Sequence, residues 1–234
     1  MRILAFETSA KAASVALLED GKLVGESYQN TGLTHSQTLM VMAQDMLKQC
    51  GIAPKDIHAL AVANGPGSFT GVRIGVAAAK GFAWGARLPC YGVSTLEAMV
   101  YSLGIWQGYV CPVMDARRSQ VYNALFYVNQ GEISRVTEDR AIALEDLGKE
   151  LQTLDGPIFL VGDGSTLCHS RLSGFVPSLV LPPEHGMHQR ASGVALVAHK
   201  LALAGETADA NGLSPNYLRL SQAERERLER GQRI

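Results

Sequence analysis

Short apolar runs and longer helical stripes follow one another along the chain, and their order occurs twice. Three apolar runs come first, and the Asp20-Gly21 turn between the last two is typical of a β-hairpin. A helix, a strand, a second helix, another strand and the start of a third helix follow. In chain order, these elements cover residues 3–7, 13–18, 22–29, 36–50, 57–63, 70–86 and 89–93, and the third helix opens at Ser94 or Thr95.

The same order begins again at Tyr109, where an apolar strand ends in a carboxylate at Asp115, as the first strand ends at Glu7. The later strands and helices are predicted over residues 120–128, after 129–131, 144–154, 158–161, after 164 and 189–203. Hairpins are antiparallel, whereas strand-helix-strand crossovers are parallel. We therefore predict an α/β fold of two similar lobes, each a mixed sheet with flanking helices.

The boundary between the lobes is expected near residues 103–108. The first lobe then covers residues 1–105 and the second covers residues 106–204, while residues 205–220 return to pack on the first lobe. Residues 221–234 form a charged tail that is rich in Arg and Glu and has little apolar content. Such composition favours a frayed end over one ordered by a partner.

Composition describes an ordinary cytoplasmic protein. The 234 residues are 47% hydrophobic and carry a formal net charge of −1, so a nucleic-acid role needs a local basic patch or a partner's surface. The cysteines at positions 50, 90, 111 and 168 form no C-x-x-C pair, which indicates buried thiols in a reducing compartment. No apolar run predicts a signal peptide or a membrane span.

A glycine loop separates the strand over residues 57–63 from the next helix. It consists of Gly65, Pro66, Gly67, Ser68, Phe69, Thr70 and Gly71. Free N–H groups near Thr70 and Gly71 at the head of the helix are able to hold an anion. The spacing matches neither G-x-G-x-x-G nor the P-loop pattern, and no lysine follows, so a tight turn is the favoured explanation.

Two helices carry features typical of close packing. The apolar arc of helix 36–50 is about 160° wide, more than one-sided packing needs, and includes Leu39, Met42, Ala43 and Met46. Small residues recur at four-residue spacing on helix 70–86, at Gly71, Gly75 and Ala79. The neighbour that such a stripe admits lies either inside the same domain or on another chain. We expect the seven residues to form one partner interface.

Four motifs together resemble one family from end to end of the chain. They read Ile-Leu-Ala-Phe-Glu-Thr-Ser at residues 3–9, Gly-Pro-Gly-Ser-Phe-Thr-Gly-Val-Arg-Ile-Gly at 65–75, Gly-Val-Ser-Thr-Leu at 92–96 and Pro-Asn-Tyr-Leu-Arg at 215–219. This pattern is similar to the TsaB (YeaZ) family, which belongs to the bacterial machinery that makes threonylcarbamoyladenosine (t6A) at position 37 of tRNAs reading ANN codons.

The resemblance implies an actin-like (ASKHA) fold and a scaffold subunit without catalysis of its own. The implied partners are the catalytic paralogue TsaD, the ATPase TsaE and, through the complex, tRNA. A four-helix bundle with TsaD is implied, or with a second copy in a homodimer when the chain is alone. In TsaD, two histidines of a His-Met-Glu-Gly-His stretch bind a metal. Thr95 and Met99 stand at those positions here, so no metal site is expected.

The same residues weigh against two alternative activities. An autonomous metalloprotease needs the missing histidines. An actin-like ATPase or kinase needs a glycine-bearing turn after the first strand of each lobe, so that backbone N–H groups approach phosphates. Glu7, Thr8 and Ser9 occupy one turn, and Asp115 and Arg117 the other, without glycine. We expect a degenerate nucleotide cleft with no tight ligand in the lone chain, and keep ATP or ADP at a partner interface as an alternative.

Overall fold

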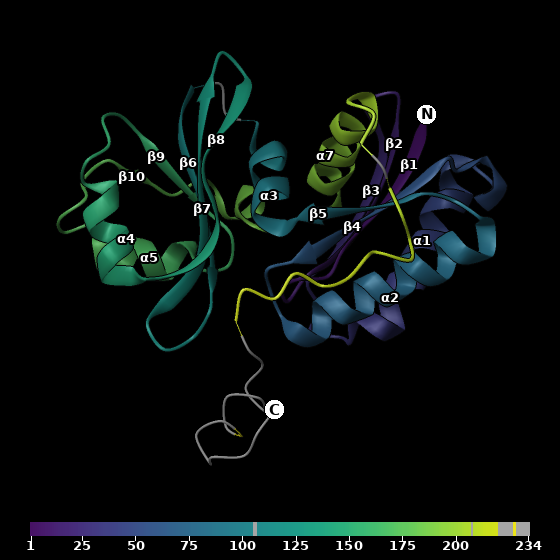
Figure 1. Ribbon diagram of the computed structural model, residues 1–234, viewed down its shortest axis with the longest axis horizontal. Helices are drawn as coiled ribbons and strands as arrows, with labels where there is room; N and C mark the ends of the chain where they lie inside the picture. Colours follow the sequence, from purple (N-terminus) through teal and green to yellow (C-terminus); the bar gives the residue numbers. More distant parts are fainter. Residues whose placement is uncertain (105–106, 207, 220–226, 228–234) are drawn as a thin grey trace.

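The computed structural model describes residues 1–104, 107–206, 208–219 and 227. Figure 1 shows two lobes side by side, each built on a five-stranded mixed sheet with flanking helices. This arrangement confirms the predicted fold class. No helix in the described ranges is long and apolar enough to cross a membrane.

The sheet of the first lobe has the strand order β3-β2-β1-β4-β5. Its central strand pairs antiparallel with β2 and parallel with β4, as the alternation of hairpin and crossover predicts. The predicted hairpin turn is confirmed, since both Asp20 (φ 47°) and Gly21 (φ 80°) adopt the left-handed conformation. The strands are β1 (Arg2–Glu7), β2 (Ala13–Glu19), β3 (Lys22–Gln29), β4 (Ala59–Gly65) and β5 (Cys90–Ser94).

Helices cover both faces of this sheet because β1 is apolar on both sides. Leu4 and Phe6 pack with α1 (His35–Cys50) and α2 (Phe69–Ala86) on one face. Ile3 and Ala5 point to the opposite face and pack with α7 (Ala191–Leu203). The predicted second lobe, residues 106–204, included α7. This assignment is wrong, because α7 packs on the sheet of the first lobe. Without α7, one apolar face of the first sheet would lie open to water.

The second sheet has the order β10-β9-β6-β7-β8. One face packs on α4 and α5, and residues of the other face pack with Leu96, Met99 and Val100 of α3. The strands are β6 (Gln107–Asp115), β7 (Gln120–Asn129), β8 (Glu132–Ala143), β9 (Ile158–Val161) and β10 (Leu179–Val180). The helices are α3 (Thr95–Leu103), α4 (Leu144–Leu151), α5 (Ser165–Leu172) and the short α6 (Glu184–Met187), with a 3₁₀ turn at Pro54–Asp56.

Helix α3 lies between the lobes (Figure 1). Its Ala98 belongs to the core that α7 forms on the first sheet, whereas Leu96 and Met99 belong to the core of the second. The two helices touch at Gly193, where an added Cβ would lie 2.0 Å from the carbonyl oxygen of Ala98. Since one helix serves both cores, the lobes share a packed junction.

Residues 208–219, here called the return segment, run along the first lobe and reach the second (Figure 1). Leu213 is buried in the core beneath α2, and the backbone N–H of Asn216 donates to the carbonyl oxygen of Asn64 at 2.6 Å. Leu218 then packs on the second lobe's core, and Arg219 donates to the carbonyl oxygen of Ala116. The return segment therefore ties the two lobes together on one side of the molecule.

Candidate functional site

The turn after β1 brings Glu7 to the junction of the lobes. Its side chain is buried, and Oε1 accepts a hydrogen bond from the N–H of Ser9 at 2.5 Å. Oε2 has no hydrogen-bond partner among the described residues. Burial, and to a smaller degree the charge of nearby Asp163, raise the pKa of Glu7 from its ordinary value of 4.5 to about 7, although the hydrogen bonds from Ser9 oppose this increase. Near neutral pH, Glu7 is thus poised between its protonated and ionised forms.

Two carboxylates of the second lobe approach the same place. Asp163 follows β9, and burial raises its pKa, although the Nε2 group of Gln189 donates to Oδ1 at 3.4 Å. The charge of Asp115, at the end of β6, also raises the pKa of Asp163. The sequence analysis assigned Glu7 and Asp115 to one cleft. In the structure, Asp163 interacts electrostatically with both of them. Asp163 was not predicted as a site residue. Its sequence signal is its position between Gly162 and Gly164, directly after a strand.

The glycine loop clamps the turn after β1. The N–H of Ser68 donates to the carbonyl oxygen of Ser9 at 2.7 Å, and Thr8 Oγ1 donates to the carbonyl oxygen of Gly71 at 2.8 Å. A Cβ on Gly67 would lie 2.6 Å from Ser9 O, and one on Gly71 would lie 2.1 Å from Thr8 O. These glycines are needed because two backbone segments touch there.

Several N–H groups at the head of α2 donate to atoms of the protein itself. Ser68 caps the helix, since its Oγ accepts from the N–H of Gly71 at 3.2 Å. The N–H of Val72 donates to Ser68 O, and the N–H of Ser68 is bound to Ser9. The tight-turn explanation of the loop accounts for these contacts without an anion.

The seven residues expected at a partner interface are buried in the chain's own core, and their assignment as contact residues is wrong. The arc of α1 faces the first sheet, and so does the small-residue stripe of α2, where a Cβ on Gly75 would lie 2.3 Å from Thr8 Oγ1. The stripe admits β1 and its turn rather than another chain. These residues are Leu39, Met42, Ala43, Met46, Gly71, Gly75 and Ala79.

A different set of residues faces outward from the same two helices, which lie side by side in Figure 1. On α2, an added Cβ at Gly81 or Gly85 would meet nothing within 4 Å. On α1, Met40 is 42% and Val41 55% exposed. We call Met40, Val41, Gly81 and Gly85 the outer face of α1 and α2. The sequence analysis missed Gly81 and Gly85, although they too are spaced by four residues.

The turn between β6 and β7 keeps a glycine-like backbone with bulky side chains. Arg117, Arg118 and Ser119 have φ values of 65°, 56° and 55°, and the N–H of Arg117 donates to Asp115 Oδ1 at 2.7 Å. A left-handed conformation is costly for residues with a Cβ, and glycine is the residue that would let a phosphate approach such a backbone closely. The turn carries no glycine, and the degenerate nucleotide cleft stays a prediction.

Thr95 and Met99, the two positions at which the family resemblance led us to expect no metal site, lie on α3. Both are buried, and Met99 packs in the core of the second lobe. Thr95 Oγ1 has no hydrogen-bond partner within the described ranges. In those ranges, no three His, Cys, Asp or Glu side chains come close enough to hold a metal ion.

Comparison with known proteins gives one family. Residues 29–225 match the family model described as "TsaD: tRNA N6-adenosine threonylcarbamoyltransferase". The chain is 34% identical to the "tRNA threonylcarbamoyladenosine biosynthesis protein TsaB" of Bacillus subtilis, over 98% of this chain and 99% of the relative. It is 36% identical to the protein of the same name from Escherichia coli, over 94% and 95% of the two chains.

A solved structure of similar architecture is YeaZ from Pseudomonas aeruginosa. It superposes with a TM-score of 0.73 at 26% identity and covers 93% of this chain and 99% of its own. A second Pseudomonas aeruginosa structure, described as an uncharacterized protein with similarity to peptidase YeaZ, gives a TM-score of 0.76 at 27% identity, with the same coverage. Both lobes and their connection are therefore shared with these structures.

Proposed function

Because the chain belongs to the TsaB family of tRNA threonylcarbamoyladenosine biosynthesis proteins, we propose that it serves t6A biosynthesis as a non-catalytic subunit that binds the catalytic paralogue TsaD. The actin-like fold of two lobes supports this role. TsaE and tRNA are further partners of the proposed complex, which we place in the cytoplasm.

The absence of independent catalysis is supported by the residues at two places. Thr95 and Met99 are poor ligands for a divalent metal, which disfavours an autonomous metalloprotease. The turns after β1 and β6 are closed by the glycine loop and by bulky side chains, which disfavours an actin-like ATPase or kinase. We propose that the lone chain holds no nucleotide tightly, and that ATP or ADP binds at the interface with a partner. Calorimetric titration with ATP, before and after TsaD is added, checks this.

The outer face of α1 and α2 is the proposed docking site for two helices of TsaD. The observations that carry this proposal are the space over Gly81 and Gly85 on α2, which no described residue fills, and the exposed side chains of Met40 and Val41 on the neighbouring α1. Glycines without a neighbour allow a second helix to approach closely, and methionine adapts to the contact. A second copy of the chain uses the same face when TsaD is absent.

The test is co-expression with TsaD of the unchanged chain and of Gly81→Leu. A leucine there should overpack the helix contact and weaken association by about ten- to hundredfold, or roughly 1–3 kcal/mol, without lowering the thermal melt of the lone chain. Gly174→Leu is the matched control, because Gly174 is also exposed with open space over its Cα but lies on the second lobe. Equal recovery of TsaD with both variants would reject this docking face, and no recovery with the unchanged chain would reject the scaffold function.

A further inference from the structure

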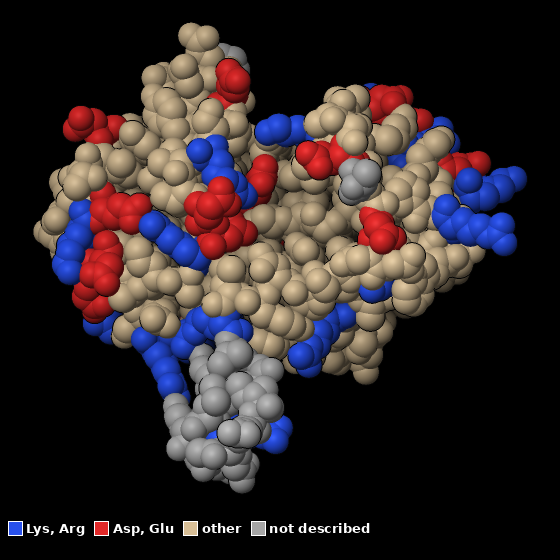
Figure 2. Space-filling view, viewed as in Figure 1, with Lys and Arg blue, Asp and Glu red and all other residues tan. Residues whose placement is uncertain are grey.

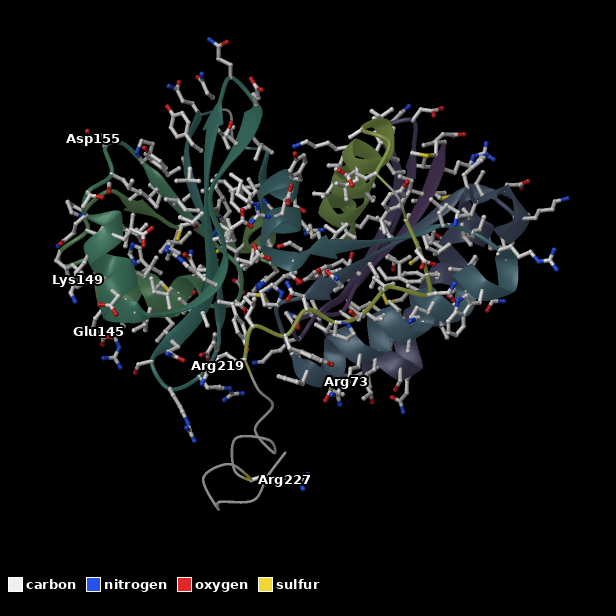
Figure 3. The ribbon with its side chains drawn as sticks, in the orientation of Figure 1. Arg73, Glu145, Lys149, Asp155, Arg219 and Arg227 are labelled. Atoms are coloured by element: carbon white, nitrogen blue, oxygen red, sulfur yellow. The ribbon has the colours of Figure 1, made fainter. Side chains whose placement is uncertain are left out.

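Cationic and aromatic side chains alternate where α2 meets the return segment. The members are Phe69, Arg73, Lys80 and Trp84 of α2 and Tyr217 and Arg219 of the return segment, and we call this surface the cationic seam. Figure 3 places Arg73 and Arg219 along the lower edge of the molecule. The seam begins on the first lobe and ends where Arg219 reaches the second.

The seam occupies its own flank of α2. Phe69, Arg73, Lys80 and Trp84 are spaced by four, seven and four residues, so they fall within about 60° of the helix circumference at 100° per residue. Gly81 and Gly85 lie about 60–100° further round. The seam and the outer face therefore lie on adjacent flanks of α2.

The side chains of the seam are held in place by contacts with one another. Phe69 and Tyr217 stack with ring centroids 4.3 Å apart and planes within 6°. Arg73 Nε donates to the Tyr217 hydroxyl at 2.6 Å, and its guanidinium carbon lies 5.6 Å and 5.5 Å from the two ring centroids. The cation is therefore positioned before any ligand arrives, which lowers the entropy lost on binding.

The Lys80 end of the seam is built in the same way. Lys80 Nζ donates to the carbonyl oxygens of Asn211 at 3.2 Å and Leu213 at 3.0 Å, and it lies 5.3 Å from the Trp84 ring. The indole N–H of Trp84 donates to Asn211 Oδ1 at 3.0 Å. Trp84 still exposes 56% of its surface and Tyr217 exposes 40%. Two rings are thus anchored by their polar atoms while much of each stays in solvent.

No carboxylate among the described residues pairs with the cations of the seam. Within that part of the chain, Arg73, Lys80 and Arg219 donate to neutral groups, whereas Arg2, Arg135, Arg140 and Arg190 each pair with a carboxylate. Figure 2 shows Lys and Arg side chains along the lower edge, beneath the junction of the lobes. The formal net charge of the whole chain is −1, so this is a local departure from a balanced surface.

We propose that the cationic seam binds RNA directly, as a contact for the tRNA on which the complex acts. Arg73, Lys80 and Arg219 meet phosphates, and an unpaired base stacks on Trp84 or Tyr217. Exposed rings between fixed cations suit a nucleic acid, in which charged phosphates alternate with flat bases. An acidic peptide would use the cations but would leave the exposed rings without a stacking partner. This inference rests on the proposed function for the identity of the RNA, but not for the surface itself.

The experiment measures binding of an unmodified tRNA transcript that reads an ANN codon. The transcript is titrated with the chain alone at low salt and with the reconstituted TsaD complex over a range of salt concentrations. The variant Arg73→Gln/Lys80→Gln should bind at least about tenfold more weakly, and the slope of log affinity against log salt should be shallower by about 2. Trp84→Ala should lower the affinity for the transcript by about five- to hundredfold.

The matched control is Lys22→Gln/Lys55→Gln, which removes two exposed lysines from elsewhere on the first lobe. Thermal melts and TsaD recovery for each variant separate RNA binding from folding and from partner docking. Unchanged tRNA affinity and salt slope in the seam variant would overturn the inference. So would a loss of TsaD without a loss of tRNA binding to the chain alone, because the seam would then be a protein contact. Absence of TsaD binding by the unchanged chain would reject the proposed function and leave the lone-chain titration to decide the seam.

Discussion

Gly75 and Thr8 touch so closely that a Cβ on Gly75 would lie 2.3 Å from Thr8 Oγ1. The glycine lies on α2, and the threonine lies in the turn after β1. Thr8 is itself fixed, since its hydroxyl donates to the carbonyl oxygen of Gly71 one turn earlier on the helix. This contact sets how deeply α2 sits on the first sheet.

Gly75→Ala should therefore destabilise the fold by about 1–3 kcal/mol, because α2 must move away from β1 to admit a methyl group. Gly81→Ala is the matched variant on the same helix, where the added Cβ meets nothing within 4 Å. It should stabilise the chain by about 0.5–1 kcal/mol through helix propensity. Urea unfolding of both variants checks the contrast, and a similar loss of stability in the two would contradict it.

Glu7 should make the stability of the chain depend on pH. Its pKa is about 7 in the folded chain, against an ordinary value of 4.5. Between these values the folded chain holds a proton that the unfolded chain releases, so stability falls as pH rises from about 4.5 to 7 and then levels off. The full effect corresponds to about 3 kcal/mol.

Replacing Glu7 by Gln removes the charge and keeps an acceptor for the N–H of Ser9. Glu7→Gln should be more stable than the unchanged chain at pH 8, by up to about 3 kcal/mol, and nearly equal to it at pH 4.5. The measurement is the free energy of unfolding at both pH values. A constant difference across this range would show that Glu7 does not titrate as described.

Arg135 should link α3 to β8. It lies on β8 and pairs with Glu97 of α3 at 2.7 Å and with Asp139 at 2.7 Å. All three side chains are less than one-quarter exposed. Arg135→Ala leaves the carboxylates of Glu97 and Asp139 without their shared cation. The substitution should lower the free energy of unfolding by about 1–3 kcal/mol, and this loss should be smaller at high salt.

Lys149→Ala is the control for Arg135, because the Lys149–Asp146 pair is exposed. Its removal should leave the free energy of unfolding almost unchanged, because water and salt screen an exposed pair. Denaturant titrations of both variants at low and high salt give the comparison. A loss that is equal in both, or unaffected by salt for Arg135→Ala, would contradict the linking role.

Although β10, α6 and the 3₁₀ turn could not be predicted from the sequence, most elements, their order and the two-lobe plan could. Local chemistry fixed them: the Asp20-Gly21 turn required a hairpin, and the apolar runs were long enough for buried strands with crossover helices between them. The carboxylates at the ends of the first strand of each lobe were also visible, since Glu7 and Asp115 each follow an apolar run. The motif match then gave the family.

Whether a given helix face is buried or exposed could be seen only in the folded chain. Gly71 and Gly75 are four residues apart, and so are Gly81 and Gly85. A Cβ added to either of the first two would meet Thr8, whereas a Cβ added to either of the last two would have no described atom within 4 Å. A periodic pattern reports which residues share a face, but burial of that face depends on what the rest of the chain places against it. Helix α7 lies on the first sheet for the same reason, because β1 and β2, which it covers, end more than 170 residues before it in sequence.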